Sequence, residues 1–216
     1  MTELILVGAG AAGLEIAEAI LQAAGQGLPV KLLGFLDDDD AAGGFPEHGI
    51  AVLGAIDRVQ AYPQASFLIG IASHRNMAQR QRMALRLDLP AQRYFTFIHP
   101  DALVSPTAVL GHGVAVMHGA DVNLRARVAD HVRVCQSAIV GHDAEIGAGC
   151  VIAPAATISG RVRIGRGTYI GAAAAIAPDL TIGEGALVGI GLAVNESLAP
   201  GARVIGNPSI AQRLRP

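Results

Sequence analysis

The fold is decided by a stretch in the second half of the chain that reads VCQSAIVGHDAEIGAGCVIAPAATISGRVRI from Val134 to Ile164. Within this stretch a branched aliphatic residue returns at every sixth position. The same spacing extends back to Ile98 and forward to Val194, and no position in the series is polar. The series comprises Ile98, Val104, Leu110, Val116, Val122, Val128, Val134, Val140, Ile146, Ile152, Ile158, Ile164, Ile170, Ile176, Ile182, Val188 and Val194. A repeat of this regularity predicts a solenoid.

Two further positions in each six-residue unit indicate the kind of solenoid. The residue after each aliphatic is often glycine or another small residue, and the fourth residue after it is small or apolar, as in Ala138, Ala144 and Cys150. Two inward positions in every six residues fit short strands joined by turns, whereas an α-helix needs apolar residues at spacings of three and four. Each unit therefore predicts one side of a triangular coil, and stacked coils share one aliphatic interior.

The first half of the chain has a different pattern, typical of a small α/β unit. Residues 4–7 predict a buried strand, which leads into the sequence GAGAAG at residues 8–13 and then into a helical pattern through Leu21. Residues 30–36 predict a second strand that ends in Asp37 and Asp38, residues 67–72 predict a third, and a helix is expected from about Asn76 to Leu87. A glycine turn between a strand and a helix presents backbone N–H groups that can bind phosphate.

The length of this first half indicates the class of ligand. Fewer than 100 residues hold only half of a doubly wound dinucleotide fold, which favours a mononucleotide or a nucleotide sugar over NAD. Asp37 lies at a suitable distance from the glycine turn for a carboxylate that binds ribose hydroxyls. The alternative is that the glycines only allow close packing of helix on strand, and that the acidic run beginning at Asp37 is a solvated loop.

Composition and charge exclude several classes of partner. Aromatic residues make up 4% of the chain and tryptophan is absent, so the core must be built from aliphatic and small side chains. The net charge is −2 without a basic cluster, which argues against binding to nucleic acid or to an anionic membrane. No apolar run approaches the roughly 20 residues that span a bilayer, and the first ten residues lack the basic leader of a signal peptide. We expect a cytoplasmic protein with a small-molecule partner.

In this order the two halves resemble a family of bacterial hexapeptide-repeat sugar acyltransferases. The family includes sialic-acid O-acetyltransferases, UDP-4-amino-sugar N-acetyltransferases and GDP-perosamine N-acetyltransferases, and the resemblance spans nearly the whole chain. Besides the glycine turn it is carried by Phe35-Leu36-Asp37-Asp38, Ile69-Gly70, Ile98-His99-Pro100, Ile139-Val140-Gly141-His142-Asp143, Ile158-Ser159-Gly160 and Gly206-Asn207-Pro208. The chain departs from the family pattern at Ala12, Cys135, Val151 and Ser209.

The resemblance implies a Rossmann-like nucleotide-sugar domain over residues 1–97 and a left-handed parallel β-helix over residues 98–216. It also implies acetyl-CoA as co-substrate, no metal, and a homotrimer with active sites between subunits. The residues expected around the nucleotide sugar are Gly8, Gly10, Ala11, Ala12, Gly13, Asp37, Asp38 and Gly70. The residues expected around coenzyme A are Val151, Gly160, Ala172 and Ile190.

His142 carries the expected chemistry. It follows the inward Val140 by two positions, so its ring is predicted to lie in a turn and to point outward toward a neighbouring subunit. Acyl transfer from a thioester needs an unprotonated nucleophile, and an imidazole can accept a proton from an amine or hydroxyl at neutral pH. The resemblance assigns His142 as general base and Asp143 as its supporting acidic residue, in a direct transfer to the amine of a nucleotide-linked amino sugar.

Other functions remain open at this point. The acceptor can be a hydroxyl, as in the sialic-acid enzymes. Some hexapeptide-repeat trimers bind zinc through three histidines and hydrate carbon dioxide, but His112, His118 and His131 lack the required spacing. A noncatalytic scaffold is a third alternative. Neither Cys135 nor Cys150 suits an acyl-carrying nucleophile, because Cys150 occupies an inward position and Cys135 has no histidine beside it in the sequence.

Overall fold

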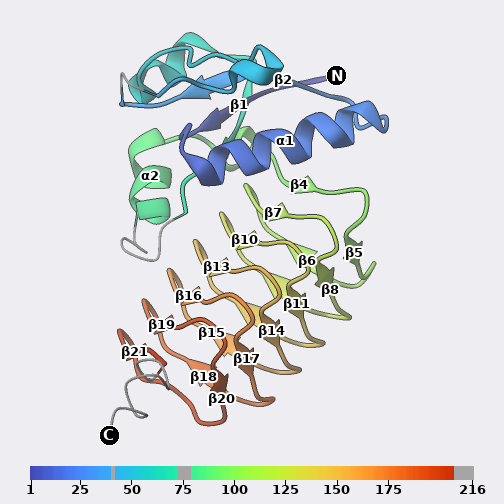
Figure 1. Ribbon diagram of the computed structural model, residues 1–216, viewed down its shortest axis with the longest axis vertical. Coiled ribbons are helices and arrows are strands. Elements are labelled where there is room, and N and C mark those ends of the chain that lie inside the picture. The colour runs from blue at the N-terminus through green and yellow to red at the C-terminus, as the bar shows by residue number, and fades with distance from the viewer. Residues whose placement is uncertain (40–41, 73–78, 207–216) are drawn as a thin grey trace, which may run out of the picture.

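A computed structural model describes residues 1–39, 42–72 and 79–206, which form a small α/β part above a long prism of stacked coils (Figure 1). The α/β part contains β1 (Thr2–Val7), α1 (Ala11–Gly25), β2 (Val30–Leu36), β3 (Ser66–Ile69) and α2 (Gln79–Leu87). It also contains the short 3₁₀ helices η1 (Pro46–His48), η2 (Ile56–Ala61) and η3 (Ala91–Arg93). The three strands are parallel in the order β2-β1-β3, which is the half of a doubly wound sheet that the length of this region predicts.

Two elements of the α/β part have bounds in the structure that differ from the predicted ones. The strand expected over residues 67–72 stops at Ile69, because its partner β1 ends at Val7 and the last ladder bond is the one from the Gly70 N–H to the Val7 carbonyl. The helix expected from Asn76 is described only from Gln79 onward, and residues 76–78 lie outside the described residues. The predicted strand over residues 30–36 is confirmed.

The prism has three faces, each built from strands of two residues. The first face contains β4 (Phe97–Ile98), β7 (Ala115–Val116), β10 (Arg133–Val134), β13 (Val151–Ile152), β16 (Tyr169–Ile170), β19 (Leu187–Val188) and β21 (Arg203–Val204). The second face contains β5 (Leu103–Val104), β8 (Asp121–Val122), β11 (Ile139–Val140), β14 (Thr157–Ile158), β17 (Ala175–Ile176) and β20 (Ala193–Val194). The third face contains β6 (Val109–Leu110), β9 (Arg127–Val128), β12 (Glu145–Ile146), β15 (Arg163–Ile164) and β18 (Thr181–Ile182).

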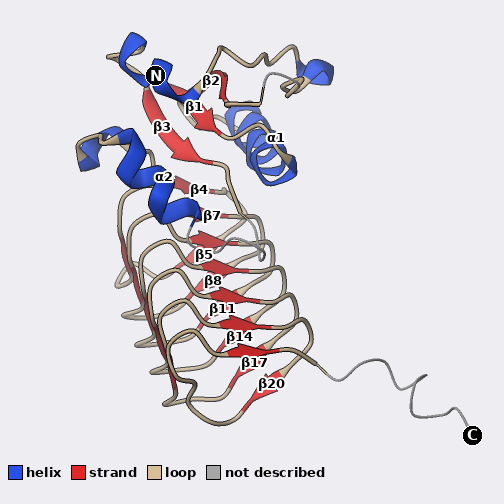
Figure 2. Cartoon of the chain, turned by 90° about the vertical axis from the view of Figure 1, so that its left-hand side faces the viewer, coloured by secondary structure: helices blue, strands red, loops and turns tan. Residues whose placement is uncertain are grey.

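All neighbouring strands in each face are parallel and lie 18 residues apart within the regular coils, so three six-residue units complete one turn of a left-handed β-helix (Figure 2). The predicted fold class is therefore confirmed. We call the corner between the first and second faces the first corner, and the corner between the second and third faces the second corner.

The interior of the prism is the predicted aliphatic column. From Val116 to Val194 the members of the six-residue series are buried, and the second inward positions, such as Ala138 and Cys150, pack among them. Ile98 is an exception, because 39% of its surface is exposed. It belongs to β4, the end strand of the first face, and within the described residues no coil stacks above it.

The α/β part packs against the outside of the prism near its first coils. Phe97, Ala115 and Met117 at the upper end of the first face are buried with the apolar side of α1 in one cluster. Helix α1 covers one face of its sheet and α2 covers the other, while the β3 edge of the sheet lies toward the prism (Figure 2). This packing brings the glycine turn that precedes α1 close to the first face of the prism.

Candidate active site

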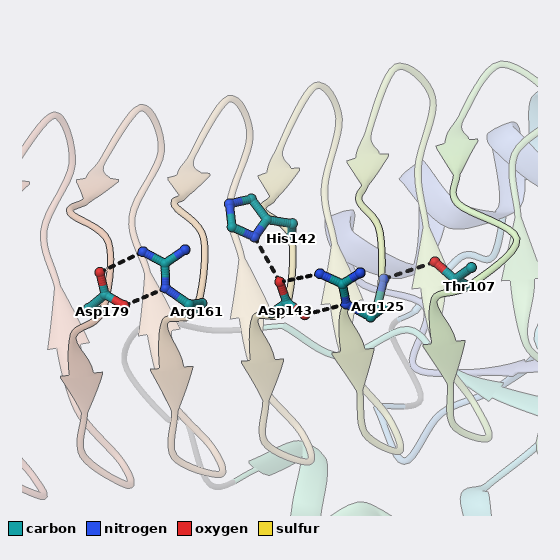
Figure 3. A network of polar contacts seen from close by, with 6 residues as sticks. All are labelled: Thr107, Arg125, His142, Asp143, Arg161 and Asp179. Atoms are coloured by element: carbon teal, nitrogen blue, oxygen red, sulfur yellow. Dashed lines mark hydrogen bonds and ion pairs between the residues drawn. The ribbon is translucent and has the colours of Figure 1, made fainter.

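His142 lies in a turn of the second corner, as predicted, and 46% of its side chain is exposed (Figure 3). The turn follows β11 and is held by hydrogen bonds to the coils on either side. The Asp143 N–H donates to the Leu124 carbonyl of the coil before, and the His142 carbonyl accepts from the Arg161 N–H of the coil after. The imidazole is therefore mounted on rigid backbone at the surface of the prism.

Asp143 orients the ring. Its carboxylate Oδ2 lies 2.8 Å from His142 Nδ1, and its backbone has a φ of 58°, in the left-handed region. Hydrogen bonds from Arg125, and next from His142, hold the pKa of the Asp143 carboxyl well below its usual range. Asp143 is therefore ionised at neutral pH and can only accept hydrogen bonds. This assigns the proton of the neutral imidazole to Nδ1 and leaves the lone pair on Nε2.

Gly160 provides the space for this ring. It occupies the turn of the next coil, and a Cβ at Gly160 would lie 2.4 Å from His142 Nε2. Any side chain at residue 160 would push the imidazole out of its place. Within the Ile158-Ser159-Gly160 motif, Gly160 matters most for His142, because glycine has no side chain to displace the ring.

Sequence reasoning missed the charges that surround this pair. Arg125 donates from Nε and Nη2 to both oxygens of Asp143, at 2.6 and 3.0 Å, and Arg161 binds Asp179 in the same way, at 2.5 and 2.8 Å. The four residues share one position in successive coils, at intervals of 18 residues, and their charges alternate (Figure 3). With three six-residue units in each coil, the 18-residue spacing of these charged residues in the sequence would have predicted that they stack.

The predicted nucleotide-sugar residues line one hollow of about 640 Å³ at the carboxyl ends of the α/β strands. Among the expected residues the hollow includes Gly8, Gly10, Ala11, Ala12, Asp37, Asp38 and Gly70. Gly13 is not part of its lining. A Cβ at Gly13 would lie 2.0 Å from the Gly8 carbonyl oxygen, so this glycine allows α1 to pack against the strand ends. Gly10, in contrast, has no atom within 4 Å of its ideal Cβ position and faces open space.

The two aspartates at the end of β2 have different surroundings. Asp37 accepts the Ala9 N–H at 2.6 Å and the Asp39 N–H at 2.9 Å, so it braces the glycine turn from the side. Asp38 pairs with Arg86 of α2 and accepts the Ile56 N–H at 3.1 Å. Its hydrogen bond with Arg86 lowers the pKa of the Asp38 carboxyl. Asp37 therefore remains the better placed of the two for a ribose hydroxyl.

Two buried arginines that the sequence did not single out connect the hollow to the prism. Arg133 of the first face donates to Glu15 at 2.5 Å and to the Ala12 carbonyl at 3.3 Å in the first turn of α1. Arg80 of α2 donates to the carbonyls of Ile71 and His131, at 2.6 and 2.9 Å. The contacts of Arg133 with α1 and of Arg80 with His131 join residues 51 to 121 positions apart, so local sequence patterns contain no signal for them.

The expected coenzyme A residues lie on both sides of the second face. Gly160 belongs to the second corner, with His142, whereas Ala172 and the exposed Ile190 lie in turns of the first corner. Val151 lies on the first face and lines a cavity of about 260 Å³ with Ala12 and Arg133. Ala172 and Ile190 therefore share a corner with each other and not with Gly160 and His142.

The other candidate nucleophiles and bases are less suited to catalysis. Burial raises the pKa of the Cys150 thiol to about 12 and also raises the pKa of Cys135, so neither forms a thiolate readily. Burial, and next the nearby Arg80, lowers the pKa of His131 to about 4. Within the described ranges, no group of three His, Cys, Asp or Glu side chains is arranged to hold a metal ion. No helix in these ranges is long and apolar enough to cross a bilayer.

Sequence comparison finds one short match to a protein of known activity. No protein-family model matches the chain. A stretch of 55 residues is 40% identical to UDP-N-acetylbacillosamine N-acetyltransferase from Bacillus subtilis, and this match covers 26% of the chain and only 24% of that protein.

Solved structures match over almost the whole length. The acetyltransferase domain of PglB from Neisseria gonorrhoeae, in complex with acetyl coenzyme A, is 31% identical with a TM-score of 0.80, and the match covers 95% of this chain and 97% of that one. A histidine-to-asparagine variant of perosamine N-acetyltransferase from Caulobacter crescentus, in complex with CoA and GDP-perosamine, is 27% identical with a TM-score of 0.83 over 96% and 95%. The chain therefore belongs to the hexapeptide-repeat sugar N-acetyltransferases and is an acetyltransferase that uses acetyl-CoA.

Proposed function

We propose that the protein transfers the acetyl group of acetyl-CoA to the amine of a nucleotide-linked amino sugar, with His142 as general base. The observation that carries the proposal is the His142–Asp143 pair, whose geometry leaves Nε2 as the proton acceptor at the surface of the prism, in a chain whose α/β part has a hollow of nucleotide size. The relatives named above support the substrate class, since one was solved with GDP-perosamine and another is a UDP-N-acetylbacillosamine N-acetyltransferase.

The chemistry requires only one proton acceptor. The sugar amine attacks the thioester carbonyl, the new C–N bond forms, and His142 Nε2 takes the proton that the nitrogen loses. Asp143 stabilises the resulting imidazolium through Nδ1. When the C–S bond breaks, the imidazolium returns its proton to the departing thiolate. Within the described residues the Gly160 N–H donates no hydrogen bond, so it is available to the oxyanion beside the ring.

A thiol-release assay tests the proposal. With acetyl-CoA present, we expect release of free coenzyme A with at least one of a panel of UDP-, GDP- and dTDP-linked amino sugars. Free sialic acid serves as the control for O-acetylation, because its acceptor is a hydroxyl. Turnover of sialic acid alone would contradict the assignment to N-acetylation, and failure of every acceptor would contradict the proposed substrate class. Acetyl-CoA is supplied in the cytoplasm, where we place the reaction.

We further propose a homotrimer in which the second face packs against a neighbouring copy. This face carries the exposed Leu103 and Ile139, and Leu124 is exposed at its edge. The third face instead presents the charged Arg127, Glu145 and Arg163. Apolar residues on one face and charges on another favour the second face as the contact surface. Such packing would bring the second corner of one protomer toward the first corner of the next.

Light scattering coupled to size exclusion tests this arrangement. We expect the wild-type mass to be about three times that of one chain, and we expect Leu103→Asp combined with Ile139→Asp to yield monomers without acetyltransferase activity. Val109→Asp is the matched control, because Val109 is also an exposed aliphatic of the first coil but points outward from the third face. A double variant that remained trimeric, or a control that dissociated, would exclude the second face as the interface.

A further inference from the structure

Arg125 contacts the catalytic pair without reaching the imidazole. Its guanidinium holds both oxygens of Asp143, and one of these, Oδ2, is also the oxygen that meets His142 Nδ1. The three side chains therefore form a chain of contacts from Arg125 through Asp143 to His142 (Figure 3). Arg125 is itself fixed, since its backbone N–H donates to Thr107 Oγ1 at 3.0 Å.

We propose that Arg125 is a positioning residue for the acetyl transfer, which sets both the orientation and the proton affinity of His142 by holding and neutralising Asp143. The inference rests on the proposed role of His142 as general base. The bidentate contact leaves the Asp143 carboxylate one orientation, and that orientation presents Oδ2 to Nδ1. The ring is then held between Asp143 on one side and the backbone of Gly160 on the other.

The effect on proton affinity follows from the signs of the charges. A carboxylate beside an imidazole stabilises the protonated ring, and an arginine that neutralises the carboxylate weakens this stabilisation. Arg125 therefore balances the charge of the carboxylate oxygen that faces His142 Nδ1. The other charged groups near the ring are Arg161 and Asp179, which neutralise each other through their own bidentate contact. Arg125 is the arginine that contacts the Asp143 carboxylate directly.

The predicted consequence is a change in pH dependence. In Arg125→Gln the Asp143 charge is no longer balanced, so the protonated imidazole is favoured. We expect the acid limb of kcat/KM to move up by about 0.5–1 pH unit, and the plateau rate to fall several-fold because Asp143 can rotate. Arg125→Lys keeps the charge and should restore the position of the acid limb but not the full plateau, since lysine cannot make the bidentate contact.

A matched control is available in the same corner. The double variant Arg161→Gln/Asp179→Asn removes the equivalent ion pair but leaves Asp143 and Arg125 in contact, and it should leave the acid limb in place. Both pairs are exposed, so neither change should unfold the prism, which circular dichroism can verify. A purely structural role for Arg125 would lower the rate at every pH without moving the acid limb.

A second measurement does not depend on substrate. In full-length protein labelled with ¹⁵N-histidine, the His142 signals are identified by their loss in His142→Gln, and the imidazole is titrated directly. Wild type should show the Nδ1–H tautomer, and Arg125→Gln should shift the titration midpoint upward by the same 0.5–1 pH unit, approximately. An unshifted midpoint, or an equal shift in the control double variant, would overturn the inference. If His142→Gln were fully active, the proposed base would fail instead, whatever Arg125 does to the titration.

Discussion

Replacing His142 by asparagine is expected to lower kcat by about 10²–10⁴-fold, the loss typical of a missing general base. Asparagine preserves a polar side chain of similar reach and can still contact Asp143, but it cannot take up a proton. Because the substitution removes a proton acceptor that acts in the transition state, KM for acetyl-CoA should change by less than about threefold. Steady-state thiol release with the acceptor identified from the sugar panel provides the measurement.

His112→Asn is the control for this experiment. His112 is also a turn residue of the prism, but it follows β6 at a different corner from His142, and its backbone N–H donates to Asp130 Oδ1. Its replacement should leave kcat within about twofold of wild type. A His142→Asn enzyme with nearly normal turnover would remove His142 from the mechanism and leave the family membership of the chain unaffected.

Gly13→Ala is expected to destabilise the α/β part by about 2–4 kcal/mol, which for a small region is a large fraction of its stability. The added methyl group would lie 2.0 Å from the Gly8 carbonyl oxygen, and a Cβ at Gly70 would similarly approach the Gly13 Cα at 2.8 Å. Backbone meets backbone on both sides, so the clash cannot be relieved by rotating a side chain. Helix α1 would have to move off the strand ends.

Gly10→Ala tests the same turn without the clash. Gly10 caps α1 with a φ of −74°, which alanine adopts freely, so the cost should stay below about 1 kcal/mol. Its methyl group would instead enter the hollow and should weaken binding of UDP or GDP, which calorimetry can measure. Urea unfolding followed by helical ellipticity reports on the α/β part, because α1 and α2 belong to it. Equal stabilities of the two variants would show that Gly13 is not a packing residue.

The prism, the His142–Asp143 pair and the glycine turn could be predicted from the sequence. The six-residue period predicted the prism because each unit repeats the same local geometry, and the pairing of His142 with Asp143 was predictable because the two residues are adjacent in sequence. The sequence also predicted the glycine turn, although it could not distinguish the role of Gly13 from that of Gly10. That distinction depends on which backbone lies opposite each Cα: the Gly8 carbonyl and Gly70, which follows β3, approach Gly13, whereas Gly10 faces open space.

The local pattern of residues by itself determined the stacked triangular coils, the strand-turn-helix at the amino terminus and the outward position of His142, since all three follow from spacings of a few residues. Only the tertiary structure decided that Arg125 binds Asp143, that Arg80 and Arg133 join the two parts, and that Ile98 remains 39% exposed at the end of the prism. These contacts and this exposure depend on how the coils stack and on where the α/β part packs against the prism. Contacts between distant residues are set by the packing of whole elements, which leaves no periodic trace in the chain.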